Sequence, residues 1–339
     1  MQKRGYMEKE QKTYSEFRQM LFDMLSEQLP GDCRVERRTV RKNNAVEMEG
    51  FTITSDKSRI APHFNIASYY QKYRNGQTAE NLVQEMLCTY EEAMKKRKQE
   101  DFDFSFANCQ DKIFIKLVSR ERNQPELDNI PNISFLDLSI IFHILFSKEE
   151  EGICSVQITN KIVKDWGITT VSLLKLARKN TEVLFPKRMC SMYSMLHELL
   201  GKNFSLEMKS EYQEENSAEY EADGFGLMNT GEYEADGCGL MNNGADEPYV
   251  ITNEMGINGA TVILYPNMLE EIGEALRGDF YLLPSSIHEM IVLSAKSGFE
   301  KEELRQMVND ANETCVEREE ILSDCVYYYS VADRTIRIL

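Results

Sequence analysis

The chain has 339 residues, of which 42% are hydrophobic and 28% are charged, and its formal net charge at pH 7 is −17. This composition is typical of a globular protein and excludes a disordered or fibrous chain, while the length suits two or three packed units at about 100–200 residues each. The acidic excess also argues against a protein that binds nucleic acid over its whole surface, because such binding needs a basic surface.

The sequence shows no membrane segment, signal peptide or metal-binding motif. Its longest apolar run, residues 135–146, is interrupted by Asp137, Ser139 and His143 and is shorter than the about 20 apolar residues that span a bilayer. No apolar core follows the basic N-terminus, so a signal peptide is not expected. The eight cysteines are scattered without a C-x-x-C pair, and the histidines form no H-E-x-x-H pattern. We therefore expect a cytoplasmic protein with reduced thiols, no membrane association, no bound metal and no cofactor.

The first predicted unit, residues 13–105, mixes helices and strands. Its first helix follows an apolar period of three to four residues; Thr13 or Ser15 caps this helix and Pro30-Gly31 ends it. Strand and turn signals then predict two strands joined by a turn, a third short strand and a longer helix. These elements are expected at residues 33–40, 45–54, 63–66 and 79–98.

The second predicted unit, residues 106–204, also combines both kinds of element. Apolar runs predict strands near 112–123, 137–146 and 153–158, and a helical period predicts helices at 159–165, 169–181 and 189–201. Thr169 or Thr170 suits the start of the second of these helices, and Gly201 suits the end of the third.

Residues 205–248 form an acidic linker that contains one phrase twice. Residues 219–231 and 232–244 differ at two of 13 positions, and the linker has one basic and twelve acidic residues, a balance of 1 − 12 = −11. Each copy contains Asp-Gly but lacks the closing acid of a calcium loop, and two copies are fewer than a solenoid needs. We interpret the repeat as a duplication within a surface loop, since the cost of closing a loop grows slowly with its length. The alternative is an acidic tether that docks on a basic partner or mimics nucleic acid.

The last predicted unit, residues 249–339, is expected to contain antiparallel sheets with packed helices. Asn258-Gly259 predicts a hairpin between strands at 249–254 and 260–265. A second strand pair crosses Ser285-Ser286, and a third hairpin ends the chain. These two pairs are expected at 280–284 with 288–293 and at 325–330 with 334–339, and helices at 267–276 and 300–313. Because strands and helices do not alternate as βαβ units, the predicted fold class is α+β.

Five segments carry a family resemblance when they are taken together and in this order: "APHFNIASYYQKYRNG", "KDWGITTVSLLKLARKNTEVLFP", "YVITNEMGINGATVILYPNMLEEI", "DFYLLPSSIHEMIVL" and "EEILSDCVYYYS". They resemble a domain-of-unknown-function family of anaerobic gut Firmicutes, number 5688, from about Tyr14 to Ile338. The C-terminal part is more distantly similar to another uncharacterised bacterial family, of the YtpQ type. The resemblance implies a cytoplasmic bacterial protein, often carried on mobile elements, and implies no activity, cofactor or catalytic residue. The doubled phrase departs from the family, in which the connection before the "YVITNE" strand is short.

The best candidate for chemistry is the turn "LPSSIHEM", which holds Ser285, Ser286, His288 and Glu289. A serine and the histidine could supply a nucleophile and a base, with Glu289 or a distant acid orienting the base. Two observations argue against this: consecutive strand residues point to opposite faces, and the chain has no G-x-S-x-G elbow. In the alternative interpretation the serines satisfy turn amides and His288 is a partly buried strand residue.

The strand "RVERRTVRK" gives a basic cluster from Arg34 to Lys42, which could contact nucleic acid. Glu36, Glu47 and Glu49 lie on the same predicted hairpin and dilute its charge. A solvated hairpin face is therefore the alternative interpretation, because charge runs usually mark exposure.

These observations predict a non-enzymatic interaction or binding protein whose partner is a protein rather than a nucleic acid. A small-molecule hydrolase that uses Ser285, Ser286 and His288 is the alternative. A regulator that contacts nucleic acid through the Arg34–Lys42 hairpin is a further alternative. The identity of the partner, the oligomeric state and the packing of the units stay open.

Overall fold

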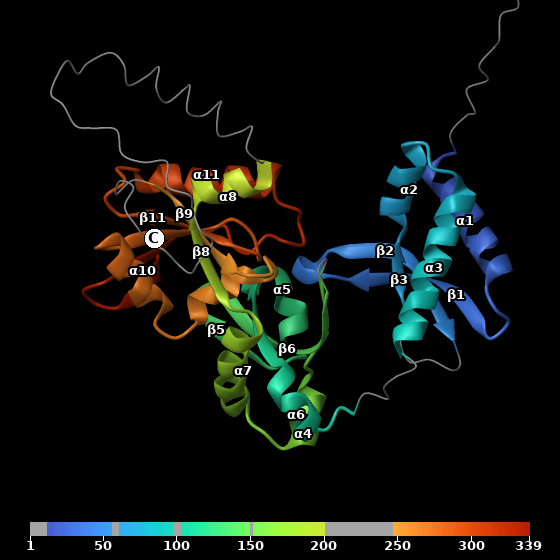
Figure 1. Ribbon diagram of the computed structural model, residues 1–339, viewed down its shortest axis with the longest axis horizontal. Helices are drawn as coiled ribbons and strands as arrows, with labels where there is room; N and C mark the ends of the chain where they lie inside the picture. Colours follow the sequence, from blue (N-terminus) through green and yellow to red (C-terminus); the bar gives the residue numbers. More distant parts are fainter. Residues whose placement is uncertain (1–11, 56–60, 98–102, 150–151, 201–246) are drawn as a thin grey trace, which may run out of the picture. The chain divides into compact units, whose positions relative to one another are not determined.

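The computed structural model describes residues 12–55, 61–97, 103–149, 152–200 and 247–339 (Figure 1). These residues form two compact units, of which the first ends at Asp103 and the second begins at Phe104. Both units combine helices with antiparallel sheets, which confirms the α+β class. No helix among these residues is long and apolar enough to cross a membrane.

The first unit packs three helices on a three-stranded sheet of order β1-β2-β3. Its elements are α1 (Tyr14–Gln28), β1 (Cys33–Arg41), β2 (Glu47–Ser55), β3 (His63–Asn65), α2 (Ile66–Arg74) and α3 (Ala79–Arg97). Thr13 caps α1 as predicted: its hydroxyl accepts from the Glu16 amide, and the Glu16 carboxylate accepts from the Thr13 amide at 2.9 Å. This reciprocal pair satisfies two of the amides that a helix leaves free at its start.

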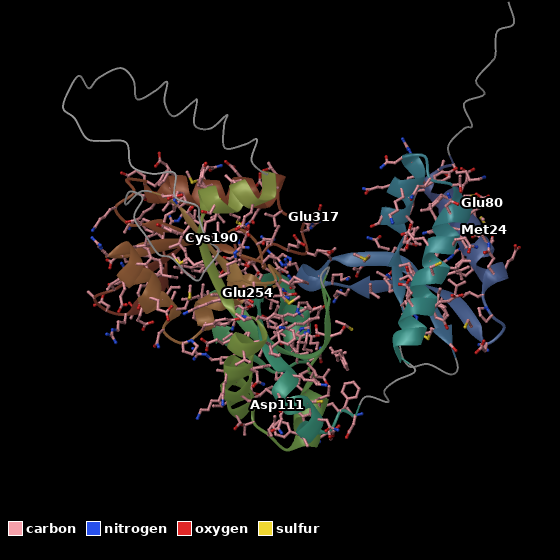
Figure 2. The ribbon with its side chains drawn as sticks, in the orientation of Figure 1. Met24, Glu80, Asp111, Cys190, Glu254 and Glu317 are labelled. Atoms are coloured by element: carbon pink, nitrogen blue, oxygen red, sulfur yellow. The ribbon has the colours of Figure 1, made fainter. Side chains whose placement is uncertain are left out.

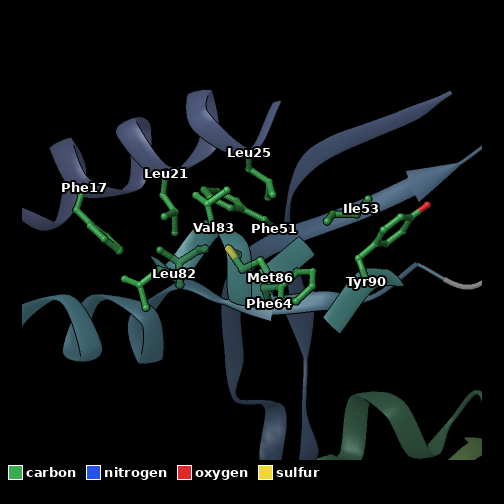
Figure 3. Close-up of a cluster of buried hydrophobic side chains, with 11 residues drawn as sticks. Phe17, Leu21, Leu25, Phe51, Ile53, Phe64, Leu82, Val83, Met86 and Tyr90 are labelled. Carbon is green, nitrogen blue, oxygen red and sulfur yellow. The ribbon is translucent and has the colours of Figure 1, made fainter. Parts of the chain in front are cut away.

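One hydrophobic core holds the first unit together (Figure 3). Phe17, Leu21 and Leu25 of α1 lie four residues apart, so they share one helix face. They pack with buried side chains from the sheet and from α3, namely Phe51, Ile53, Phe64, Leu82, Val83, Met86 and Tyr90. Burying each such side chain contributes about 1.5–3 kcal/mol. The first unit therefore has the core of an independent folding unit.

The second unit contains a four-stranded sheet built around β6 (Leu138–Glu149). β4 (Ile113–Ser119) pairs with one edge of β6, and β5 (Asn132–Phe135) and β7 (Gly152–Gln157) pair with the other edge. The helices of this region are α4 (Phe106–Cys109), α5 (Arg120–Leu127), α6 (Asn160–Trp166) and α7 (Thr170–Leu184). α7 covers the outer edge of β4, because the Thr181 hydroxyl accepts from the Ile115 amide at 3.0 Å.

The second sheet of this unit has six strands in the order β13-β12-β10-β11-β9-β8. Its strands are β8 (Lys187–Ser191), β9 (Tyr249–Asn253), β10 (Phe280–Pro284), β11 (Met290–Ser294), β12 (Tyr327–Ser330) and β13 (Thr335–Ile338). The helices beside it are α8 (Met192–Leu200), α10 (Met268–Leu276) and α11 (Lys301–Thr314). Arg188 of β8 pairs with Glu198 of α8, whereas Lys187 pairs with Glu271 of α10. Because neighbouring strand residues point to opposite faces, α8 and α10 cover opposite faces of the sheet (Figure 1).

Three expected elements are wrong in whole or in part. Residues 120–123, expected at the end of a strand, begin α5. Residues 260–264, expected as a strand, lie in a 3₁₀ helix, Gly259–Leu264, while β9 pairs with β8 and β11 instead. The whole 3₁₀ helix is buried, and an apolar run that is buried on all sides does not distinguish a strand from a helix. Residues 189–191, expected to begin a helix, end β8, and α8 begins only at Met192.

Residues 106–204 and 249–339, which the sequence pattern separates, lie in one compact unit. β8 from the first range pairs with β9 from the second. In addition, Asp137 accepts hydrogen bonds from the Ser323 hydroxyl at 2.6 Å and from the Tyr327 phenol at 2.8 Å. Contacts between residues this far apart in the chain leave no local signal in the sequence.

Candidate functional site

The turn between β10 and β11 uses both of its serine hydroxyls internally. Ser285 Oγ donates to Glu289 Oε1 at 3.1 Å, and Ser286 Oγ accepts from the His288 amide at 3.0 Å. The Ser285 and Ser286 amides point at the Glu289 carbonyl, at 3.3 and 3.4 Å. The structure thus brings the four predicted residues together as a closed turn.

The His288 ring braces three segments of the chain. Its Nδ1 accepts from the Asn258 amide at 3.2 Å, so the ring proton lies on Nε2, which faces Glu320 Oε1 at 3.4 Å. The His288 carbonyl accepts from the Thr252 hydroxyl at 2.8 Å. Gly259 packs directly beneath, where an added Cβ would collide with Thr252 and with the His288 carbonyl. Both ring nitrogens are therefore occupied by partners other than a serine hydroxyl.

The basic hairpin neutralises much of its own charge. Arg38 donates to Glu36 through Nε at 2.8 Å, and Arg41 Nη2 lies 3.5 Å from Glu47 Oε1. Arg37 lies over the ring of Phe22, with its guanidinium carbon 4.7 Å from the ring centroid. These contacts, made by exposed side chains, favour the interpretation as a solvated face.

The doubled phrase at 219–231 and 232–244 lies outside the described residues. Among the residues that are described, no group of three or more His, Cys, Asp or Glu side chains is placed to hold a metal ion. None of the seven described cysteines forms a disulfide. Burial raises the pKa of Cys190 on β8, so this thiol is protonated at neutral pH and is a poor nucleophile.

A groove of about 470 Å³ lies beside β8 and α10. Met189, Met268 and Ile272 give it an apolar lining. The rest of its lining is charged, with residues of both signs: Lys187, Arg188, Glu254 and Glu271. Lys187 and Glu271 form an ion pair, and Glu254, labelled in Figure 2, is exposed. Ligand and partner sites commonly combine apolar lining with a few charged groups, so this groove is a candidate binding site.

The outer edge of β8 runs along this groove and pairs with no strand among the described residues. The Met192 amide donates to the Pro248 carbonyl at 2.8 Å. In the register of β8 with β9, this bond makes Arg188 and Cys190 the residues of β8 that hydrogen-bond β9. Because bonded and non-bonded pairs alternate in an antiparallel ladder, Lys187, Met189 and Ser191 turn their backbone amides and carbonyls outward. The edge of β4, in contrast, is covered by α7.

Sequence reasoning missed this edge because it placed residues 189–201 in a helix. The available signal was weak: Lys187–Ser191 follows Pro186, and the strand has only five residues. Its pairing with β9 spans residues 192–248, so no local pattern could reveal it.

The sequence pattern of a family described as "Family of unknown function (DUF5688)" matches residues 14–331. The chain matches no curated protein and no solved structure.

Proposed function

Because the chain belongs to DUF5688, a family of unknown function, we propose a function from its own geometry: it is a non-enzymatic interaction protein that binds a protein partner at β8. The partner contributes an extended segment that pairs with the outer edge of this strand. The single observation that carries the proposal is the outward backbone of β8 beside the apolar groove.

An added strand would satisfy the outward amides and carbonyls of Lys187, Met189 and Ser191. Each backbone hydrogen bond contributes a net of about 0.5–1.5 kcal/mol, so three residues give affinity but little selectivity. Selectivity comes from the groove, because alternate side chains of an extended segment point to the same side. We infer a partner segment that places an apolar side chain against Met189, the half-buried apolar residue of the groove lining.

Charge favours a partner with basic residues next to that segment. The acidic linker carries twelve acidic residues against one lysine and ends directly before β9, the neighbour of β8. Complementary charge speeds the encounter of two proteins more than it strengthens the final complex. The linker therefore raises the rate of association, and β8 with its groove holds the partner.

The alternatives have less support. A hydrolase at the Ser285–Glu289 turn needs a serine hydroxyl on a ring nitrogen of His288, and those nitrogens bond Asn258 and face Glu320. A nucleic-acid site on the Arg34–Lys42 hairpin needs free basic groups, and Arg38 is paired with Glu36. We place the protein in the bacterial cytoplasm, since none of the described cysteines forms a disulfide.

The test captures partners from the native cytoplasm on four forms of the protein: the parent, two variants of the full chain and one deletion. The parent is compared with Met189→Pro, which removes one outward amide without removing a bond to β9. Ile338→Pro is the matched control, because the Leu339 amide bonds the Val326 carbonyl at 2.9 Å and Ile338 therefore turns outward at the opposite edge of the same sheet. The fourth form lacks residues 207–247. The fluorescence of Trp166, the single tryptophan, reports whether each form is folded.

A protein that is retained by the parent and by Ile338→Pro but lost with Met189→Pro supports the proposal. If the form that lacks residues 207–247 captures this protein more slowly, the acidic linker raises the rate of association. If every retained protein binds folded Met189→Pro as well as the parent, β8 is not the binding edge and the proposal is wrong.

A further inference from the structure

One face of the four-stranded sheet carries a polar strip between two apolar clusters. The pairing of β4 with β6 puts Phe114 opposite His143, Lys116 opposite Ile141 and Val118 opposite Ser139, so these six side chains share a face. At one end, Phe114 packs with Leu145 and Phe185. At the other end, Val118 and Ile141 pack with Leu127 and Ile130. Lys116 and His143 lie between these clusters.

Lys116 is a cation without an acceptor. Its ammonium makes no hydrogen bond or ion pair within the described part of the chain, and it lies over the Phe114 ring, 5.6 Å from the centroid. The side chain is half-buried, and this desolvation lowers the pKa of Lys116 to about 8. A charged group that is partly removed from water normally has a counter-ion. Lys148, on β6, differs from Lys116 in having an acceptor. It also lies over an aromatic ring, that of Phe185, but its ammonium donates to the Leu184 carbonyl.

His143 supplies a neutral donor beside this cation. Burial, and then the nearby Lys116 charge, hold the pKa of His143 well below its usual range, so the ring is neutral at pH 7. Its Nδ1 lies 3.2 Å from Ser155 Oγ on β7. With the serine hydroxyl donating to Nδ1, the ring proton is on Nε2, where it is available to an acceptor. Ser155 thus positions the histidine and does not itself bind the ligand.

We propose that this polar strip binds the phosphate group of a small phosphorylated compound, with Lys116 as the counter-charge and His143 as a second donor. A lysine ammonium is a compact point charge that suits a tetrahedral oxyanion, whereas the strip has no guanidinium fork that would select a planar carboxylate. This site is separate from the β8 groove and goes beyond the proposed function.

The test uses inorganic phosphate as the probe and the full chain at constant ionic strength, set with chloride. Titration calorimetry on the parent is expected to show one saturable phosphate site, with acetate binding more weakly. Lys116→Met keeps the apolar stem and removes the charge, and it is expected to weaken phosphate binding at least tenfold. Because the lysine charge is desolvated, this variant is expected to be no less stable than the parent in urea. His143→Phe is expected to weaken binding by a smaller factor, and Ser155→Ala by a smaller factor still.

Lys148→Met is the matched control, because this lysine also lies over an aromatic ring but already has an acceptor. Its phosphate affinity is expected to equal that of the parent. Three outcomes overturn the proposal: no saturable phosphate binding by the parent, an equal loss in the two lysine variants, or an unchanged affinity in folded Lys116→Met. The partner-capture experiment does not depend on this site, so the two proposals fail separately.

Discussion

The phenol of Tyr327 donates to Asp137 Oδ1 at 2.8 Å, which joins the six-stranded sheet to the turn between β5 and β6 of the four-stranded sheet. Ser323 Oγ donates to the other oxygen of the same carboxylate at 2.6 Å. Burial, and then the Asp137 charge, raise the pKa of Tyr327, so the phenol keeps its proton. One carboxylate thus fastens two sheets that are far apart in the chain.

We predict that Asp137→Ala lowers the free energy of unfolding of the second unit by about 3 kcal/mol, because two hydrogen bonds to a charged group are lost and the buried hydroxyls of Tyr327 and Ser323 lose their acceptor. Urea unfolding followed by Trp166 fluorescence measures this change. Tyr327→Phe should cost more than Tyr328→Phe, since Tyr327 is fully buried while Tyr328 is partly exposed and bonds Asp279 instead. Equal costs for the two tyrosines would contradict the structural role of Asp137.

Gly259 is predicted to tolerate no side chain. Gly259→Ala places a methyl group against the Thr252 hydroxyl and the His288 carbonyl oxygen. These two groups are hydrogen-bonded to each other, so neither can shift without breaking that bond. We expect a loss of about 1–3 kcal/mol, as for overpacked core positions. Gly152→Ala is the control, because nothing lies within 4 Å of its added Cβ, and its cost should stay below about 1 kcal/mol. A mild effect at Gly259 would mean that the 3₁₀ helix is less tightly seated than the structure shows.

The second unit is predicted to lose stability as the pH falls below about 6.5. The pKa of His143 is lowered in the folded state, so below the ordinary histidine value the unfolded chain binds more protons than the folded one. The linkage sign is then positive: stability rises with pH in this window, by up to about 1.4 kcal/mol per pH unit. Urea midpoints between pH 7 and 5, read from Trp166, measure the slope. His143→Gln should flatten it, and an unchanged slope in this variant would assign the effect to other groups.

His288 is predicted to matter for stability and not for binding. His288→Ala removes the acceptor of the Asn258 amide and the contact with Glu320, so we expect a loss of about 1–2 kcal/mol. Partner capture by the folded variant should be unchanged. If this substitution abolished function while stability stayed the same, the hydrolase alternative would replace the interaction protein. Ser286→Ala serves as a comparison, because it removes only a turn bond to the His288 amide.

Local signals in the sequence were sufficient for elements whose partners are close in the chain. The hairpins β1–β2, β10–β11 and β12–β13 are short, and their turn residues and alternating patterns identify them directly. The caps of α1 at Thr13 and of α7 at Thr169 follow from the same local chemistry. The first unit, which consists of such elements, was therefore largely predictable.

The remaining features depend on contacts that no local pattern contains. β8 is a strand because it pairs with β9. The apolar run at residues 260–264 does not show by itself that it forms a buried 3₁₀ helix rather than a strand. The strip with Lys116 and His143 appears only when the register of β4 and β6 is known, since that register brings the two side chains to one face. The turn with Ser285 and His288 was located correctly, but the partners of its ring nitrogens come from segments near residues 258 and 320.

The hydrogen bond between Tyr327 and Asp137 has a consequence for the order in which the two units fold during synthesis. At about 5–20 residues per second, the 190 residues that separate these partners take a ribosome roughly 10–40 s to add. The first unit has its whole core within the first hundred residues and can fold during this interval. The four-stranded sheet cannot complete its packing until Ser323 and Tyr327 have been synthesised, because these residues pair with Asp137. During this time the sheet surface that meets the rest of the second unit is uncovered. Until then the newborn chain exposes this surface, so we expect proteolysis and misassociation during synthesis to act on the second unit rather than on the first.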